Sequence, residues 1–138
     1  MDNEQVLTKE EFLILNSIRF SKFEVDPLDI NIIKMQIDIS KKVKSIMVGQ
    51  EQPCDFQEQY LSKDPTKQIG LITIDCLINK NTQCSLILTV YNKEKMAEES
   101  TCLFRGNLAD LSDYLSGTSF SGICKGHIMW FDYVLQKK

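Results

Sequence analysis

Histidine is nearly absent from this sequence, since His127 is the only one among 138 residues. A zinc site that needs two histidines is therefore excluded. The glycine-rich patterns G-x-G-x-x-G and G-x-x-x-x-G-K-[ST], which bind phosphate groups, do not occur. The serine-hydrolase pattern G-x-S-x-G is also missing. Common signatures of metal, nucleotide and acyl-transfer enzymes are thus not found.

Long apolar runs and a basic charge excess are lacking as well. No run approaches the roughly 20 apolar residues that span a bilayer, and the polar start MDNEQVLTKEEFL is unlike a secretory signal. The five cysteines form no C-x-x-C pair, which favours reduced, mostly buried thiols. The formal net charge of −3 gives no field for nucleic acid or anionic lipid. We expect a cytoplasmic protein that binds no membrane, nucleic acid or cofactor.

The clearest positive signal is the hairpin QIGLITIDCLINKNTQCSLILTVYN, residues 68–92. The polar stretch 79–82 supplies its turn, and alternate residues on both arms form one fully apolar face. The second face is half apolar, and its large members are Leu71, Leu77, Ile87 and Tyr91. A mixed face of this kind predicts a cover, which is a helix, a second sheet or another subunit.

The segments before the hairpin are harder to interpret. Alternating apolar and polar residues predict a strand over 33–40. Residues 12–25 fit either a helix, begun by the capping box of Thr8 and Glu11, or a strand from about Leu13, which we prefer. Residues 49–68 are polar, contain two prolines and predict a long loop.

After the hairpin in the sequence, a further strand is predicted over 100–106. A short helix that Asn107 caps is predicted over 107–117. The segment 127–135 fits a helix or a strand, and its aromatic residues favour the strand. We therefore expect one domain over 1–138 of the α+β class. Its antiparallel sheet should dominate, with one or two short helices on one face.

Few residues suggest catalysis. Cys124 and His127 lie three apart with no orienting group, so a thiol nucleophile is disfavoured. Asp110 and Asp113 suit a solvated helix face better than a metal site. Arg105 suits a carboxylate or phosphate clamp, but an ion pair with Asp110 is the commoner arrangement. The aromatic residues near the C-terminus suit either an interface or the core.

Surplus apolar surface, rather than reactive groups, is the recurring feature. We therefore expect a non-catalytic, homo-oligomeric protein that binds an apolar or extended polypeptide. The expected contact residues are Leu71, Leu77, Ile87, Tyr91, Trp130, Phe131 and Tyr133.

The order of segments also resembles the SecB-type export chaperones and their relatives. The segment LNSIRFSKFEVDP is similar to a strand with an aromatic I-x-F pattern, on Ile18, Phe20 and Phe23. The segment IMWFDYV, 128–134, is similar to the aliphatic–aromatic block before that family's main helix. The resemblance implies an antiparallel sheet with helices on one face, self-association through sheets, and a groove for extended apolar polypeptide.

A second hypothesis is a small immunity or inhibitor protein, encoded by a mobile element, that masks one macromolecular target. The negative net charge of the chain and the long loop over 49–68 suit that role. A third is an enzyme whose site leaves no sequence signature. A chaperone should bind several unfolded chains, an inhibitor one folded target, and an enzyme should lose activity on a single polar substitution.

Overall fold

The computed structural model describes residues 6–20, 27–50, 56–61, 70–117 and 119–137. Along the chain the elements are α1 (Lys9–Phe20), α2 (Pro27–Met47), β1 (Phe56–Leu61), β2 (Gly70–Ile78), β3 (Gln83–Asn92), β4 (Ala97–Asn107), α3 (Leu108–Ser116) and α4 (Ser119–Gln136). The expected α+β class with an antiparallel sheet is confirmed. The helices are longer and more numerous than the one or two expected, because segments predicted as strands are helical.

The sheet is antiparallel in the order β1-β2-β3-β4, so each strand pairs with the next along the chain. The hairpin expected at 68–92 is β2 and β3. The Asn79 side chain holds its turn, because Oδ1 accepts hydrogen bonds from the backbone N–H groups of Asn81 (2.9 Å) and Gln83 (3.0 Å). The predicted turn at 79–82 is thus confirmed.

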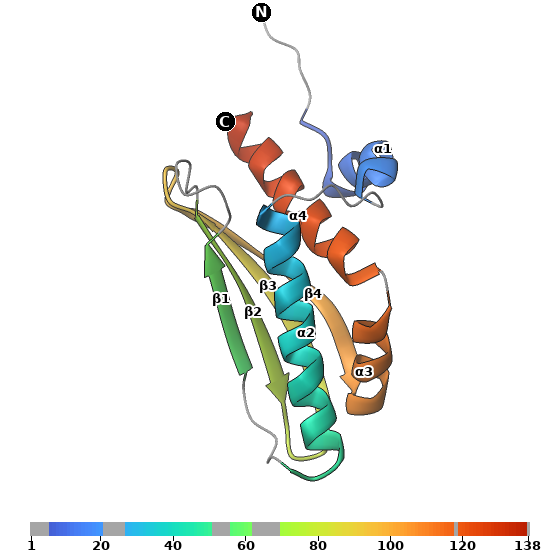
Figure 1. The fold of residues 1–138 in the computed structure, drawn as a ribbon. Helices are drawn as coiled ribbons and strands as arrows, with labels where there is room; N and C mark the ends of the chain where they lie inside the picture. The colour runs from blue at the N-terminus through green and yellow to red at the C-terminus, as the bar shows by residue number, and fades with distance from the viewer. Residues whose placement is uncertain (1–5, 21–26, 51–55, 62–69, 118, 138) are drawn as a thin grey trace, which may run out of the picture.

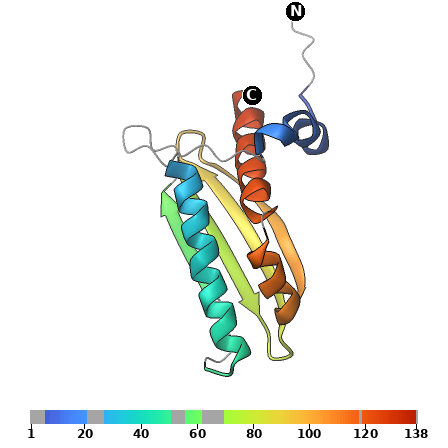
Figure 2. The same cartoon turned by 45° about the vertical axis from the view of Figure 1, so that its right-hand side comes forward.

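Helices α2, α3 and α4 cover one face of the sheet (Figures 1 and 2). The side chains of β2 and β3 alternate between the two faces. The buried set is Ile72, Ile74, Cys76 and Ile78 from β2, and Cys84, Leu86, Leu88 and Val90 from β3. This is the face that the hairpin pattern marks as fully apolar, and the main core lies between it and the helices.

The strand expected over 33–40 is wrong, because these residues belong to α2. The helix buries a stripe spaced by three or four residues, made of Ile32, Met35, Ile39, Val43 and Ile46. Ile33 and Ile37 share the alternating pattern but point outward, with 39% and 48% of their surfaces exposed. Pro27 begins this helix, where proline's missing N–H costs no hydrogen bond.

The strand preferred from Leu13 is also wrong, and the helical alternative holds for α1. Thr8 and Glu11 form the capping box: the Glu11 N–H donates to Thr8 Oγ1 (3.1 Å), and the Thr8 N–H to Glu11 Oε1 (2.8 Å). Of the aromatic pattern in this segment, Ile18 and Phe20 therefore lie in a helix. Phe23 lies outside the described residues.

The strand preferred over 127–135 is wrong as well, since this segment is the second half of α4. Ile128, Phe131 and Leu135 are buried on one face of the helix, at a spacing that a strand does not produce. The loop expected over 49–68 contains β1. The rest of that segment, apart from residues 49 and 50, lies outside the described residues.

The predicted strand at 100–106 and helix at 107–117 are confirmed as β4 and α3. The Asn107 side chain caps α3 by accepting a hydrogen bond of 2.8 Å from the Asp110 N–H. The leucine stripe of α3 is buried as expected, and consists of Leu108, Leu111 and Leu115. Of the cysteines in the described ranges, Cys76, Cys84 and Cys124 are buried and Cys102 is exposed.

Candidate binding surface

The face of the sheet opposite the helices carries no described helix (Figures 1 and 2), and we refer to it as the open face. Directly opposed residues of antiparallel strands point to the same side, so the strand register identifies its members. On β2, β3 and β4 they are Leu71, Thr73, Asp75 and Leu77, then Ser85, Ile87, Thr89 and Tyr91, and finally Glu98, Ser100, Cys102 and Arg105. Each is half-buried or exposed.

The four sheet residues expected to contact a partner all lie on this face. Leu71 is paired directly with Tyr91 at one end of the hairpin. Leu77 lies at the other end with 38% of its surface exposed, and Ile87 lies between the two ends. The structure therefore brings this part of the predicted set together on one surface.

The three aromatic residues that were also expected to contact a partner do not lie on the open face. They are Trp130, Phe131 and Tyr133. Phe131 is 6% exposed and belongs to the core, so its assignment as a contact residue is wrong. Trp130 packs against the core from α4, and Tyr133 stacks on Phe12 with ring centroids 5.0 Å apart. All three are on α4, which covers the opposite face, so they cannot form one surface with the open face.

Sequence reasoning missed that β4 adds hydroxyl and thiol groups to the open face. Thr89 and Ser100 pair across β3 and β4 with their hydroxyl oxygens 2.8 Å apart. Cys102 lies opposite Ile87, and the register then shifts at a bulge. Because of this shift, Cys102 and Arg105 share a face although they are three residues apart. Strict alternation cannot predict this arrangement.

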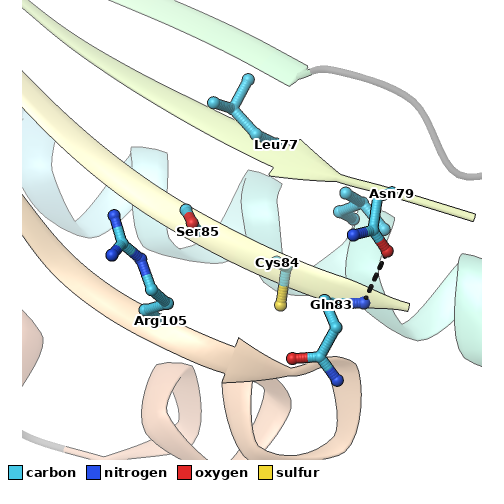
Figure 3. A pocket seen from close by; sticks show the side chains of 7 residues that line it. Leu77, Asn79, Gln83, Cys84, Ser85 and Arg105 are labelled. Atoms are coloured by element: carbon cyan, nitrogen blue, oxygen red, sulfur yellow. Dashed lines mark hydrogen bonds between the residues drawn. The ribbon is translucent and has the colours of Figure 1, made fainter. Parts of the chain in front are cut away.

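A shallow pocket of about 360 Å³ lies where the open face meets the β2–β3 turn (Figure 3). Its lining residues are Leu77, Ile78, Asn79, Gln83, Cys84, Ser85 and Arg105. Within the described chain no ion pair joins Arg105 to Asp110, the partner expected for it. Instead, Arg105 lies opposite Ser85 on the open face and is exposed.

The thiol and imidazole considered for nucleophilic catalysis have other surroundings. Burial raises the pKa of the Cys124 thiol, which disfavours the reactive thiolate. His127 Nδ1 lies 2.9 Å from Lys9 Nζ, and Nε2 lies 3.3 Å from the Glu99 carbonyl oxygen. The Lys9 ammonium can only donate, so Nδ1 accepts and Nε2–H donates to Glu99. His127 thus links α4 to α1 through Nδ1 and to β4 through Nε2.

Because of His127, we expect the folded protein to lose stability in acid. Burial, followed by the Lys9 charge, lowers the pKa of His127 from 6.5 to about 4, although its hydrogen bond to Glu99 acts in the opposite direction. The unfolded chain therefore binds the proton more readily, and this contribution to stability is lost as the pH falls from 6.5 towards 4. Chemical denaturation from pH 8 to pH 4.5 should show a steeper loss for the wild type than for H127Q. Parallel profiles would contradict the assignment.

Within the described ranges, no group of three or more His, Cys, Asp or Glu side chains is arranged to hold a metal ion. In the same ranges, each helix is too short or too polar to cross a lipid bilayer. Comparison with protein families, with curated proteins and with solved structures found no match to this chain.

Proposed function

We propose that this chain is a non-catalytic protein-binding module that receives an apolar or extended polypeptide segment on its open face. The observation that carries the proposal is the placement of Leu71, Leu77, Ile87 and Tyr91 on the one sheet face that no described helix covers. A half-apolar sheet face that a domain does not cover from within is a common site for a macromolecular partner.

The chemistry of the open face suits a polypeptide better than a small apolar ligand. Its apolar side chains alternate with hydroxyl groups, such as those of Thr73, Thr89 and Ser100. Covering the apolar part contributes roughly 25 cal/mol per Å², from which the cost of ordering the partner is subtracted. The hydroxyl groups can exchange hydrogen bonds with a backbone. In the described sheet, β4 is also an edge strand, which gives a second route through β-addition.

The resemblance to SecB-type chaperones supports the same mode of binding and adds self-association through sheets. We give it less weight than the open face, because Ile18 and Phe20 lie in a helix. Under this proposal the chain is a homo-oligomer, and a second copy and a client compete for related surfaces. An inhibitor of one folded target would use the same face, and the choice of probe distinguishes the two roles.

The test introduces lysine at two positions of the open face, Leu77→Lys and Ile87→Lys together. The wild-type protein should bind reduced, carboxymethylated α-lactalbumin, a permanently unfolded chain, and the double variant should bind it at least about tenfold more weakly. Two charges placed on the face should also lower the mass of any oligomer that forms there. Calorimetry and light scattering measure the two effects.

The matched control is Ile30→Lys with Ile33→Lys, the same kind of change on the outward side of α2. It should bind as the wild type does. Equal affinity and equal mass for the wild type and the open-face variant would refute the proposal. A wild-type protein that ignores unfolded chains but binds one folded target through Leu77 and Ile87 would identify the inhibitor role.

A further inference from the structure

The pocket at the β2–β3 turn is rich in hydrogen-bond donors and contains no acid. Figure 3 shows Leu77, Ser85 and Arg105 on three neighbouring strands, with Asn79 and Gln83 at the turn. The guanidinium, the hydroxyl and the two side-chain amides all offer N–H or O–H groups. None of the lining residues carries a carboxylate. The pocket therefore offers donors and one positive charge to a group that accepts hydrogen bonds.

Arg105 supplies the positive charge of this pocket. It is exposed, lies beside Ser85 in the strand register, and forms no ion pair with a described residue. The acid of β2 on the same face, Asp75, lies opposite Ile87 and does not line the pocket. An arginine on a sheet without an acid beside it retains all five donors for a ligand.

We propose that this pocket binds the carboxylate of an aspartate or glutamate side chain in the polypeptide that occupies the open face. The inference rests on the proposed function and adds a sequence preference to it. Arg105 binds the carboxylate through two parallel N–H···O bonds, and the Ser85 hydroxyl is placed to donate to the same group. Leu77 packs against an apolar residue next to the acid. The partner segment would thus combine an acid with neighbouring apolar residues.

The same residues argue against a phosphate-rich partner. Nucleic acid binds through several cations that follow its backbone, whereas this pocket has one cation in its lining. The further cation on the adjoining turn is Lys80, which is exposed and does not line the pocket. The net charge of −3 also opposes polyanions. One carboxylate within an apolar segment matches a pocket that is lined by one arginine and one leucine.

The test uses three synthetic peptides and isothermal titration calorimetry. The first is Thr-Val-Thr-Leu-Glu-Leu-Thr-Val-Thr with an acetylated and an amidated end. The second replaces its Glu with Gln, and the third is the Gln peptide with a free C-terminal carboxylate. The wild-type protein should bind the Glu peptide about tenfold more tightly than the Gln peptide, and the difference should shrink as salt is added.

The variants assign that preference to one side chain. R105Q should bind the Glu and Gln peptides alike, and R105K should retain part of the preference, because lysine keeps the charge but loses the paired geometry. K80Q, which removes a neighbouring cation outside the lining, should retain all of it. Circular dichroism and the melting temperature verify that each variant is folded.

Each remaining outcome decides against one part of the proposal. Equal binding of the Glu and Gln peptides to the wild type overturns the carboxylate site but leaves the open face as a polypeptide surface. A preference for the free C-terminus alone overturns the side chain as the source of the carboxylate. Equal losses in R105Q and K80Q show a diffuse charge effect instead of a site. Failure of all three peptides and of the unfolded chain overturns the proposed function as well.

Discussion

Replacing Ile39 with alanine is expected to lower the free energy of unfolding by about 2–5 kcal/mol, whereas Ile37→Ala should change it by less than about 0.5 kcal/mol. Ile39 is 1% exposed and packs between α2 and the sheet. Its truncation removes buried methyl groups and leaves a cavity. Ile37 is 48% exposed on the outward side of the same helix, so its truncation creates no cavity.

The two substitutions distinguish a helix from a strand, because both remove the same atoms. A strand over 33–40 would place Ile37 and Ile39 on one face and give them similar effects. A helix rotates them by about 200° relative to each other and gives them opposite environments. Urea denaturation monitored by circular dichroism measures both values. Losses within about 0.5 kcal/mol of each other would contradict the position of α2. In the helix Ile32→Ala should also cost more than Ile33→Ala, whereas a strand with Ile33 on its buried face would reverse that order.

The sequence around residues 33–40 contains both a strand pattern and a helix pattern, which explains why a strand was wrongly predicted there. Ile33, Met35, Ile37 and Ile39 alternate with polar residues, and this pattern is typical of a half-buried strand. The helical stripe from Ile32 to Ile46 is longer, but it is visible only over a wider window. The apolar residues on the outward side of α2 therefore complete a false alternation. A longer window would have favoured the helix.

The hairpin and α3 were predictable because local chemistry and periodicity agree there. Asn79 holds the turn and Asn107 caps the helix through bonds between residues two to four apart in sequence. The four open-face residues followed from the same alternation. The aromatic residues of α4 were misplaced because their β propensity is weaker than the packing of a helix on the sheet. The contribution of β4 was missed because the bulge after Leu86 changes the parity of the strand.

The second large effect concerns the ion pair between α2 and α4. Lys125 Nζ lies 3.0 Å from Asp29 Oδ1 and 3.2 Å from Oδ2. Asp29 is 3% exposed, and 14% of the Lys125 side chain is exposed, so water screens the pair poorly. Lys125→Met keeps much of the side-chain volume but leaves the carboxylate buried without its cation. We expect a loss of about 3 kcal/mol, near the lower end of the range for broken buried pairs. Asp29 lies in the first turn of α2, so the positive end of the helix dipole still stabilises part of its negative charge in the Lys125→Met variant.

The double variant Asp29→Leu with Lys125→Met should recover most of that loss, because apolar groups then replace both buried charges. Lys41→Met, at an exposed position of α2, controls for the general removal of a lysine and should change stability by less than about 0.5 kcal/mol. The full cycle of single and double variants, measured by urea denaturation, gives the coupling energy directly. A coupling energy near zero would mean that α2 and α4 are held together by their apolar contacts alone. The pair would then contribute nothing to the position of either helix on the sheet.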